Sequence, residues 1–309
     1  MSSATVAAGA VQVVGGVVLA PLLPGLVQHL KARLQGRRGP TPLQPYRELR
    51  RLWGKSAIDV EGTTIVYRLA PLVVVAALAA AILLVPVAER APGWGVGHDA
   101  LVLAGLFALA RFALASASWD VSNGFSLQGA SRDLTLAVFV EAVLVLALAV
   151  AALSTGTTDL RGVIAGTAGT HVWSTPALAL GAAAFALVVL AETGRQPVDN
   201  PDTHLELTMI HEGPVLEYGG RDLAFLQWAV AARHWLVLVV AAQVFLPHPA
   251  GAWWQLALLP AWLVVLCAAL ALAETAFAKM RILVVPRLLG VAAALALLGI
   301  VTWLVETTG

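Results

Sequence analysis

Cysteine is almost absent from this sequence, which has only Cys267 among its 309 residues. A single thiol forms no internal disulfide, and an iron–sulfur cluster needs about four thiolates. Cys267 lies within an apolar run, and thiols in apolar surroundings are unreactive. We therefore expect it to fill the core. We expect no cofactor in this chain, and any redox centre should belong to a partner.

Charge is also scarce, because 12% of the residues are charged whereas 59% are hydrophobic. The mean hydropathy is +0.84, which lies outside the range of soluble globular domains. Most of the protein is therefore predicted to be surrounded by lipid. Its N-terminus lacks the basic start of a signal peptide, so we expect a retained transmembrane helix there, kinked at Pro21 and Pro24.

Long apolar runs predict an all-α integral membrane protein, a bundle of eight transmembrane helices in a single membrane domain, residues 1–309. A spanning helix needs about 20 apolar residues, and helices satisfy the backbone within lipid. No internal repeat is evident, which argues against a secondary transporter built from repeats. The predicted spans cover about residues 6–28, 69–88, 100–118, 134–153, 174–191, 234–247 (with residue 225 as an alternative start), 255–273 and 288–305.

Lys and Arg residues orient this predicted bundle. The connections after the first, third, fifth and seventh spans carry 9, 1, 3 and 3 of them, which is 16 of the 19 in the chain. Connections rich in Lys and Arg face the cytoplasm. The odd-numbered connections are therefore predicted to be cytoplasmic, and both termini are predicted to lie on the outer side.

Carboxylates gather in one cytoplasmic connection, residues 192–233 between the fifth and sixth predicted spans. Seven of the eighteen in the chain lie there: Glu192, Asp199, Asp202, Glu206, Glu212, Glu217 and Asp222. Ordered connections of this length are usually functional or interfacial, although a solvated loop with scattered charges is the simplest alternative. A short helix is also expected over residues 204–212, capped by Asp202 or Thr203.

A metal site is a further alternative for this acidic connection. Four of its side chains are potential ligands: His204, Glu206, His211 and Glu212. The stretch "HEGPV" begins like the HExxH motif of metalloproteases, but Val215 stands where the second histidine belongs and Pro214 would break the helix. We therefore expect no metal there.

Ionisable residues inside apolar runs are costly unless they are paired, protonated or hydrated, and a functional role is the default. Glu141 lies in "LAVFVEAVLVLAL" and Arg111 in "FALARFALA". We predict that Arg111 pairs with Glu141 or with a carboxylate of the acidic connection, and a purely structural role for Glu141 is the alternative. Glu192 ends an apolar run, whereas Glu274 and His234 are expected to be interfacial.

The connection of residues 29–68 is basic. Within it "YRELRRLW" is amphipathic, which suits a helix lying in the membrane plane. Anchoring to anionic lipid is the simplest role for such a segment. The rigid stretch "GRRGPTPLQP" instead indicates a shaped docking surface.

Several of these motifs resemble one protein family. This family includes the core membrane subunit of respiratory complex I and the equivalent subunit of formate hydrogenlyase and other membrane-bound NiFe hydrogenases. "GRRGPTPLQPY" resembles the family's first cytoplasmic loop, "AETGRQPVDNPDTHLEL" resembles the complex I pattern AETNRAPFDLPEAESEL, and "EYGG" resembles EYSG. "GASRDLTLA", "DNPDTHLELTMIHE" and "AKMR" resemble the hydrogenase branch, of the formate hydrogenlyase subunit 4 type.

The resemblance implies a non-catalytic subunit in the inner (plasma) membrane of a bacterial or archaeal cell. Such a subunit docks a soluble redox arm and couples electron transfer to proton or sodium translocation. The implied partners are NiFe-hydrogenase-like large and small subunits, an iron–sulfur subunit, antiporter-like membrane subunits and the lipid bilayer, with no nucleic acid. The nickel–iron centre and Fe–S clusters would lie in those partners. Two alternatives are a quinone-chamber subunit of an NADH:quinone oxidoreductase and a purely structural anchor.

Two sets of residues are candidates under this resemblance. The ion-coupling set is Arg111, Glu141, Glu192, Arg195, Asp199, Asp202, Glu206, Glu212 and Glu217. The partner-docking set is Arg37, Arg38, Gln44, Tyr46, Arg132, Tyr218, Arg221, Lys279 and Arg281. Neighbouring carboxylates that are partly out of water titrate as a coupled set, which makes the first set suitable for holding and passing a proton.

Overall fold

The computed structural model describes residues 2–92, 94, 98–169, 175–199 and 210–308, and their regular structure is almost entirely helical. The α-helices are α1 (Ser3–Val14), α2 (Leu22–Leu34), α3 (Gln44–Trp53), α4 (Ile65–Leu84), α5 (Ala100–Val121), α6 (Gly124–Thr155), α7 (Leu160–Thr167), α8 (Pro176–Glu192), α9 (Gly220–Val240), α10 (Ala252–Ala276) and α11 (Val285–Thr308). Shorter elements are the π-helical segments η1 (Gly15–Leu19) and η4 (Ala241–Phe245) and the 3-10 turn η3 (Gly213–Val215). Within the described ranges, extended backbone pairs only at an isolated bridge between Asp99 and Asp159.

Six of the described helices are long and apolar enough to cross a membrane: α4, α5, α6, α9 continued by η4, α10 and α11. The number is seven if the bent pair at residues 3–34 is one span, and α8 is a shorter apolar helix of 17 residues. Each of the predicted apolar runs overlaps one of these helices. The prediction of an all-α membrane protein is therefore confirmed.

The first predicted span is bent by 59° between residues 3–19 and 22–34. Pro21 stands at the bend, where its ring nitrogen has no N–H to donate to the preceding turn. The predicted kink is thus present. Gly15 allows the helix to approach α9 just before this bend, because a Cβ there would overlap the ring of Trp235.

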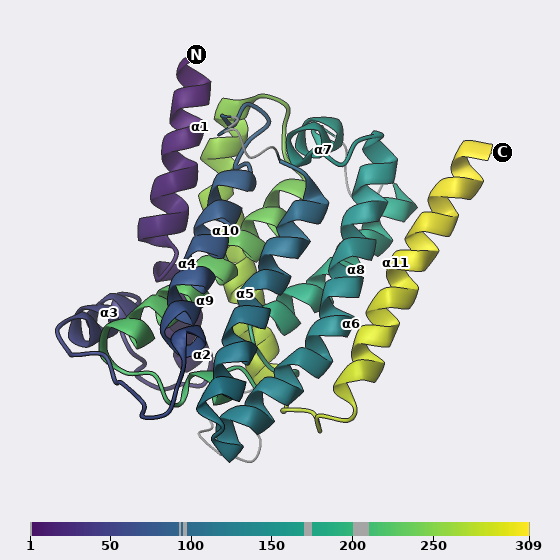
Figure 1. Cartoon of the computed structure of the whole chain (residues 1–309). Coiled ribbons are helices and arrows are strands. Elements are labelled where there is room, and N and C mark those ends of the chain that lie inside the picture. The colour runs from purple at the N-terminus through teal and green to yellow at the C-terminus, as the bar shows by residue number, and fades with distance from the viewer. Residues whose placement is uncertain (1, 93, 95–97, 170–174, 200–209, 309) are drawn as a thin grey trace.

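The helices form one bundle with distinct ends. α4 packs against α5 and α9, α11 packs against α6 and α8, and α10 packs against α2. In Figure 1 both chain ends lie at the same end of the bundle, where α7 also lies, whereas α3 lies at the opposite end. α3 packs against α9, and the rings of Trp53 and Phe225 are 5.1 Å apart. We call these the terminal end and the α3 end.

The last turn of α4 lies at the terminal end and leaves carbonyl groups without helical donors. Lipid offers no donors, and side chains from other elements supply them. Gln12 Nε2 donates to two carbonyls of this turn, both at 2.8 Å. His98 Nδ1 lies 2.5 Å from Leu84 O, and Gln243 Nε2 lies 2.5 Å from Val87 O. The amide of Gln12 thus ties α4 to α1, and the amide of Gln243 ties the segment just after α4 to η4.

The sixth span begins earlier than predicted. α9 starts at Gly220, before the predicted start near residue 234 and five residues before the alternative start near 225, so the acidic connection ends before residue 220 and Arg233 lies inside a helix. Gly220 has φ +55°, and a Cβ there would overlap Ser56 O, so the start of α9 requires glycine. The prediction of an interfacial His234 is wrong, because this side chain is buried within α9.

Two local predictions concern the connections at the α3 end. α3 is the predicted amphipathic helix, with Leu52 buried and Arg50 and Arg51 exposed. α2 and α4 extend further than predicted, so fewer residues flank α3 on either side. The short helix predicted over residues 204–212 falls mostly outside the described residues.

Candidate ion-coupling site

Arg111 and Glu192 form the centre of a buried group of charges. Arg111 lies midway along α5, and Glu192 is the last residue of α8. Arg111 Nη2 lies 2.7 Å from Glu192 Oε2, and the two side chains are 5% and 0% exposed. The predicted pairing of Arg111 with a carboxylate of the acidic connection is therefore confirmed.

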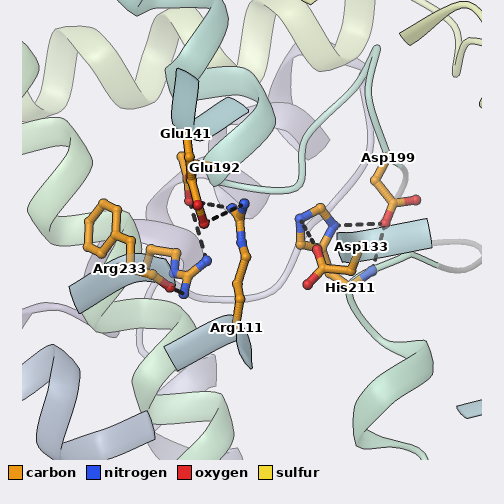
Figure 2. Close-up of polar contacts among 8 residues, drawn as sticks. Arg111, Asp133, Glu141, Glu192, Asp199, His211 and Arg233 are labelled. Carbon is orange, nitrogen blue, oxygen red and sulfur yellow. Dashed lines mark hydrogen bonds and ion pairs between the residues drawn. The ribbon is translucent and has the colours of Figure 1, made fainter. Parts of the chain in front are cut away.

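Glu141 and Arg233 complete what we call the Arg111 cluster (Arg111, Glu141, Glu192 and Arg233). Arg111 Nη1 lies 3.7 Å from Glu141 Oε1 on α6, and Arg233 Nη1 on α9 lies 3.4 Å from Glu192 Oε2. The guanidinium carbon of Arg233 also lies 5.2 Å from the ring centroid of Phe107, a favourable cation–π contact. Figure 2 shows both carboxylates turned toward the two guanidinium groups.

The Arg111 cluster is formally balanced, with two cations and two carboxylates. Removing each ion from water costs several kcal/mol, and two charges 4 Å apart at an effective dielectric near 20 attract by about 4 kcal/mol. Glu192 Oε1 and Arg111 Nε are buried and have no hydrogen-bond partner among the described residues. Because its polar atoms are incompletely satisfied, the cluster should respond to a change of charge beside it.

A second buried group joins Glu274, Arg195 and Lys31. Arg195 Nη1 lies 2.9 Å from Glu274 Oε1, and Lys31 Nζ lies 3.3 Å from Glu274 Oε2. The side chain of Glu274 is fully buried, so the prediction of an interfacial Glu274 is wrong. Glu274 ends an uninterrupted apolar run, as Glu192 does, and this shared position was the signal that sequence reasoning missed.

A third group, the His211 group (Asp133, Asp199, His211 and Lys279), lies where the acidic connection meets α6. Lys279 Nζ lies 2.7 Å from Asp199 Oδ1, and His211 Nδ1 lies 3.1 Å from Asp199 Oδ2. His211 Nε2 faces Asp133 Oδ1 at 3.8 Å. Burial raises the pKa of Asp199, but hydrogen bonds from His211 and Lys279 and their electrostatic attraction outweigh it and hold this pKa well below its usual range. Asp199 therefore stays ionised.

Glu217 and Tyr218 shape the segment that leads into α9. The ring of Tyr218 stacks on Tyr67 with centroids 4.5 Å apart, and its hydroxyl donates to Tyr67 O at 2.8 Å. Glu217 Oε1 accepts from Asn123 Nδ2 at 2.6 Å. Burial, followed by the nearby charge of Tyr67 and Asp222, raises the pKa of Tyr218, so its phenol remains a donor. Tyr218 therefore lies inside the fold and not on an open docking surface.

The other docking candidates lie at the α3 end. Arg37 and Arg38 line a cavity of about 350 Å³ together with Lys31. Tyr46 donates to Val18 O at 2.6 Å and so fixes α3 against η1. The remaining members, exposed or half-buried, are Gln44, Arg132, Arg221 and Arg281.

Two members of the ion-coupling set, Asp202 and Glu206, lie outside the described residues, as does the potential ligand His204. Glu212 is half-buried. Among the residues that the structure describes, no group of three or more His, Cys, Asp or Glu side chains has the geometry of a metal site.

The three charged groups share one short segment of chain at the end of α8. Glu192 belongs to the Arg111 cluster, Arg195 to the Glu274 group, and Asp199 to the His211 group. Movement of this segment would therefore change ion pairs both inside the bundle and at the α3 end. Sequence reasoning did not find four partners in these groups: Lys31, Asp133, His211 as an ion-pair partner, and Arg233.

Comparison with known proteins finds a matching protein family and two similar proteins from hydrogenase systems. Residues 7–304 match the protein family described as NADH dehydrogenase. The chain is 34% identical over 285 residues to formate hydrogenlyase subunit 4 of Escherichia coli (strain K12), which covers 87% of this chain and 89% of that protein. It is 31% identical over 297 residues to hydrogenase-4 component C of the same organism, covering 93% and 92%.

The fold is also similar to a solved structure. A chain of the membrane-bound sulfane sulfur reductase, an archaeal respiratory membrane complex, superposes with a TM-score of 0.84. The superposition covers 97% of this chain and 99% of that one, at 19% identity. This likeness shows that the same arrangement of helices occurs in a respiratory membrane complex.

Proposed function

This chain belongs to the NADH dehydrogenase family of membrane subunits, and from that membership we propose that it serves a complex I-like, membrane-bound NiFe hydrogenase of the formate hydrogenlyase type. It docks the soluble redox arm and couples electron transfer in that arm to movement of protons or sodium ions across the membrane. The names of two relatives support this proposal, because both belong to hydrogenase systems and both match most of the chain.

The proposed membrane arrangement has eight spans, with residues 3–34 as one bent span and α8 as a short span. The basic connections then lie at the α3 end, which faces the cytoplasm according to the positive-inside rule. Both termini lie at the other end (Figure 1) and so face outward. The membrane is the inner (plasma) membrane of a bacterial or archaeal cell, and the soluble arm binds at the α3 end.

The observation that carries the coupling proposal is the chain segment shared by the three charged groups. Asp199 and Lys279 lie near the docking residues at the α3 end, whereas Glu192 is buried between α5 and α9. When the docked arm changes its charge or its contact with this segment, the field at Glu192 changes. The coupled carboxylates then redistribute their protons, because interacting sites titrate together.

Glu141 is the residue through which the Arg111 cluster would exchange an ion with a neighbouring membrane subunit. Its side chain is 24% exposed on α6 although it lies in a spanning helix, and a carboxylate there is expensive to leave against lipid tails. In the proposed complex an antiporter-like membrane subunit covers this face of α6 and exchanges the ion with Glu141. Glu141 is then the residue whose neutralisation interrupts translocation with the least damage to the core.

The test is Glu141→Gln in the intact complex reconstituted into liposomes. Charge movement is followed with a potential-sensitive dye, which responds to protons and sodium ions alike. We expect translocation per hydrogen molecule to fall by about tenfold or more, because a positioned proton-transfer group contributes at least that much. Dye-linked hydrogen oxidation should stay within about twofold, since the soluble arm carries that chemistry.

Glu306→Gln is the matched control, because Glu306 is exposed on the last turn of α11, and translocation should be unchanged. Normal translocation in both Glu141→Gln and Glu192→Gln would favour the structural anchor. Co-purification of an NADH-oxidising module with bound quinone would favour the quinone-chamber alternative.

A further inference from the structure

His211 joins two carboxylates that belong to different parts of the fold. Its Nδ1 lies 3.1 Å from Asp199 Oδ2 in the connection after α8, and its Nε2 lies 3.8 Å from Asp133 Oδ1 on α6. The backbone N–H of His211 also donates to Asp199 Oδ2, at 3.3 Å. Figure 2 shows the imidazole ring between the two carboxylates. His211 is therefore held at one nitrogen and faces a second carboxylate at the other.

The contacts of Asp199 fix which nitrogen of His211 donates to it. Asp199 is ionised and also binds Lys279 Nζ at 2.7 Å, so it accepts a hydrogen bond from Nδ1. A neutral imidazole has one donor nitrogen and one acceptor nitrogen. The Nε2 of a neutral ring would therefore direct a lone pair at the carboxylate of Asp133. A proton on Nε2 or on Asp133 removes that repulsion.

The separation between His211 and Asp133 suits a contact that opens and closes. A hydrogen bond between a nitrogen and an oxygen is about 2.7–3.2 Å long, so 3.8 Å requires an approach of roughly 1 Å before a proton can pass. Gly194 lies against the ring, where a Cβ would be 3.2 Å from His211 Nδ1. A small movement of the segment after α8 would therefore change the distance between His211 and Asp133.

Asp133 and Glu141 both lie on α6, eight residues apart, which is roughly 12 Å along the helix axis. Glu141 contacts Arg111, which in turn contacts Glu192. A change in the charge of Asp133 therefore changes the electrostatic field at the Arg111 cluster. A proton transfer at His211 thus changes the charge of Asp133, and this charge changes the electrostatic field inside the bundle.

We propose that His211 and Asp133 form a proton relay between the acidic connection and the Arg111 cluster, an inference that rests on the proposed coupling function. In the transfer step the N–H bond at His211 Nε2 breaks and an O–H bond forms at Asp133 Oδ1. The imidazolium becomes a neutral imidazole that still donates from Nδ1 to Asp199, and the Asp133 carboxylate becomes a carboxylic acid. No electron moves, and the pair keeps its total charge.

The step has a consequence for Glu141. Once Asp133 is neutral, Arg111 and Arg233 act on Glu141 without the opposing charge of Asp133, so a proton held on Glu141 is released more readily. Arrival of a proton at Asp133 and release of a proton from Glu141 are thereby linked. The pair resets when the proton returns from Asp133 Oδ1 to His211 Nε2, which restores the imidazolium and the Asp133 carboxylate.

The test uses His211→Asn and Asp133→Asn in the intact complex in liposomes. The asparagine at 211 keeps a donor for Asp199 but offers nothing to Asp133, and the asparagine at 133 keeps the shape but accepts no proton. Each variant should lower charge translocation per hydrogen molecule by about tenfold or more. Dye-linked hydrogen oxidation should stay within about twofold of its usual rate.

The double variant tests whether His211 and Asp133 act in sequence on one proton path or have two independent roles. If His211 and Asp133 act in sequence, combining the substitutions should cause no further loss, because coupled residues are not additive. Asp159→Asn is the control, since Asp159 caps α7 at the terminal end and asparagine caps equally well. This control should leave charge translocation unchanged.

The outcomes distinguish the relay from the function on which it rests. Unchanged translocation in both variants, or losses that add in the double variant, overturns the relay while Glu141→Gln still stops translocation. A Glu141→Gln complex that translocates normally overturns the proposed function itself. If the Asp133→Asn complex does not assemble, the His211→Asn variant decides whether the relay exists. The His211 side chain is 29% exposed, so its replacement should disturb the core little.

Discussion

The two ends of this bundle bury polar side chains of different kinds. At the terminal end buried amides make the polar contacts: Gln12 donates to carbonyls that the last turn of α4 leaves free, and Gln243 donates to Val87 O just beyond that helix. Toward the α3 end they are charged, in the Arg111 cluster and around Glu274. Both ends are surrounded by apolar helices, so the difference does not follow from burial alone.

The difference teaches what each end contributes. An amide that satisfies a buried carbonyl stabilises the fold by about 0.5–1.5 kcal/mol, and this is a sufficient structural role. Buried ion pairs return little net stability, because desolvation of the ions offsets their attraction, and well-packed apolar residues often replace them without loss. The charged end is therefore poorly explained by stability and well explained by ion coupling.

Arg111→Met tests the charged end and is expected to cause the largest loss of stability. Methionine fills similar space but leaves Glu192 with Arg233 alone, and removing one partner of a buried pair costs about 3–5 kcal/mol. The thermal midpoint of the purified complex and its yield should fall accordingly. Adding Glu192→Gln should restore part of the loss, because it removes the uncompensated charge.

Arg90→Met serves as the control for this loss of charge, because the Arg90 side chain is 64% exposed and its contact with Glu89 is 3.9 Å long. Exposed pairs contribute about 0–1 kcal/mol. Equal stability of Arg111→Met and Arg90→Met would mean that the Arg111 cluster is not desolvated as the contacts indicate.

Gln243→Leu tests the neutral end and should have a smaller effect. It leaves Val87 O without its 2.5 Å donor, and an unsatisfied buried group costs about 1–3 kcal/mol. The thermal midpoint should fall, whereas charge translocation per hydrogen molecule should not change. Gln227→Leu, at an exposed position of the same helix, should alter neither quantity. Loss of coupling in Gln243→Leu would show that the terminal end also carries ions.

Much of this comparison could be anticipated from local sequence. The all-helical class, the bend at Pro21 and the amphipathic α3 depend on hydropathy and on backbone chemistry within a few residues of each position. The pairing of Arg111 with Glu192 was also predictable, because a charge within an apolar run needs a partner and the choices were few.

The errors come from side chains whose partners are distant in the sequence. Arg233 interrupts an apolar pattern, so the main predicted start of the sixth span lay after it, although Glu192 on α8 and Phe107 on α5 accommodate its charge inside the bundle. Glu274 was expected at the membrane surface because Lys31 and Arg195 are not visible in its local sequence. Hydropathy locates helices, but only the packing shows which ends of helices are buried.

Asp199→Asn is expected to cause the smallest loss of stability. It tests whether Asp199 links the charged interior to the α3 end. His211 and Lys279 hold the pKa of Asp199 well below its usual range, although burial opposes them. The resulting stabilisation is fully present above the unfolded pKa of about 4 and is lost as pH falls below that value. In the intact protein, hydrogen-exchange protection of residues 193–199 should therefore decrease between about pH 4 and pH 3. Asp199→Asn should already lack this stabilisation at neutral pH, by about 1–2 kcal/mol, and should show no further loss in acid.

Glu306→Gln should behave like the unaltered protein. An acid transition that persists in Asp199→Asn would assign the sensitivity to another carboxylate and separate Asp199 from the segment that links the three charged groups.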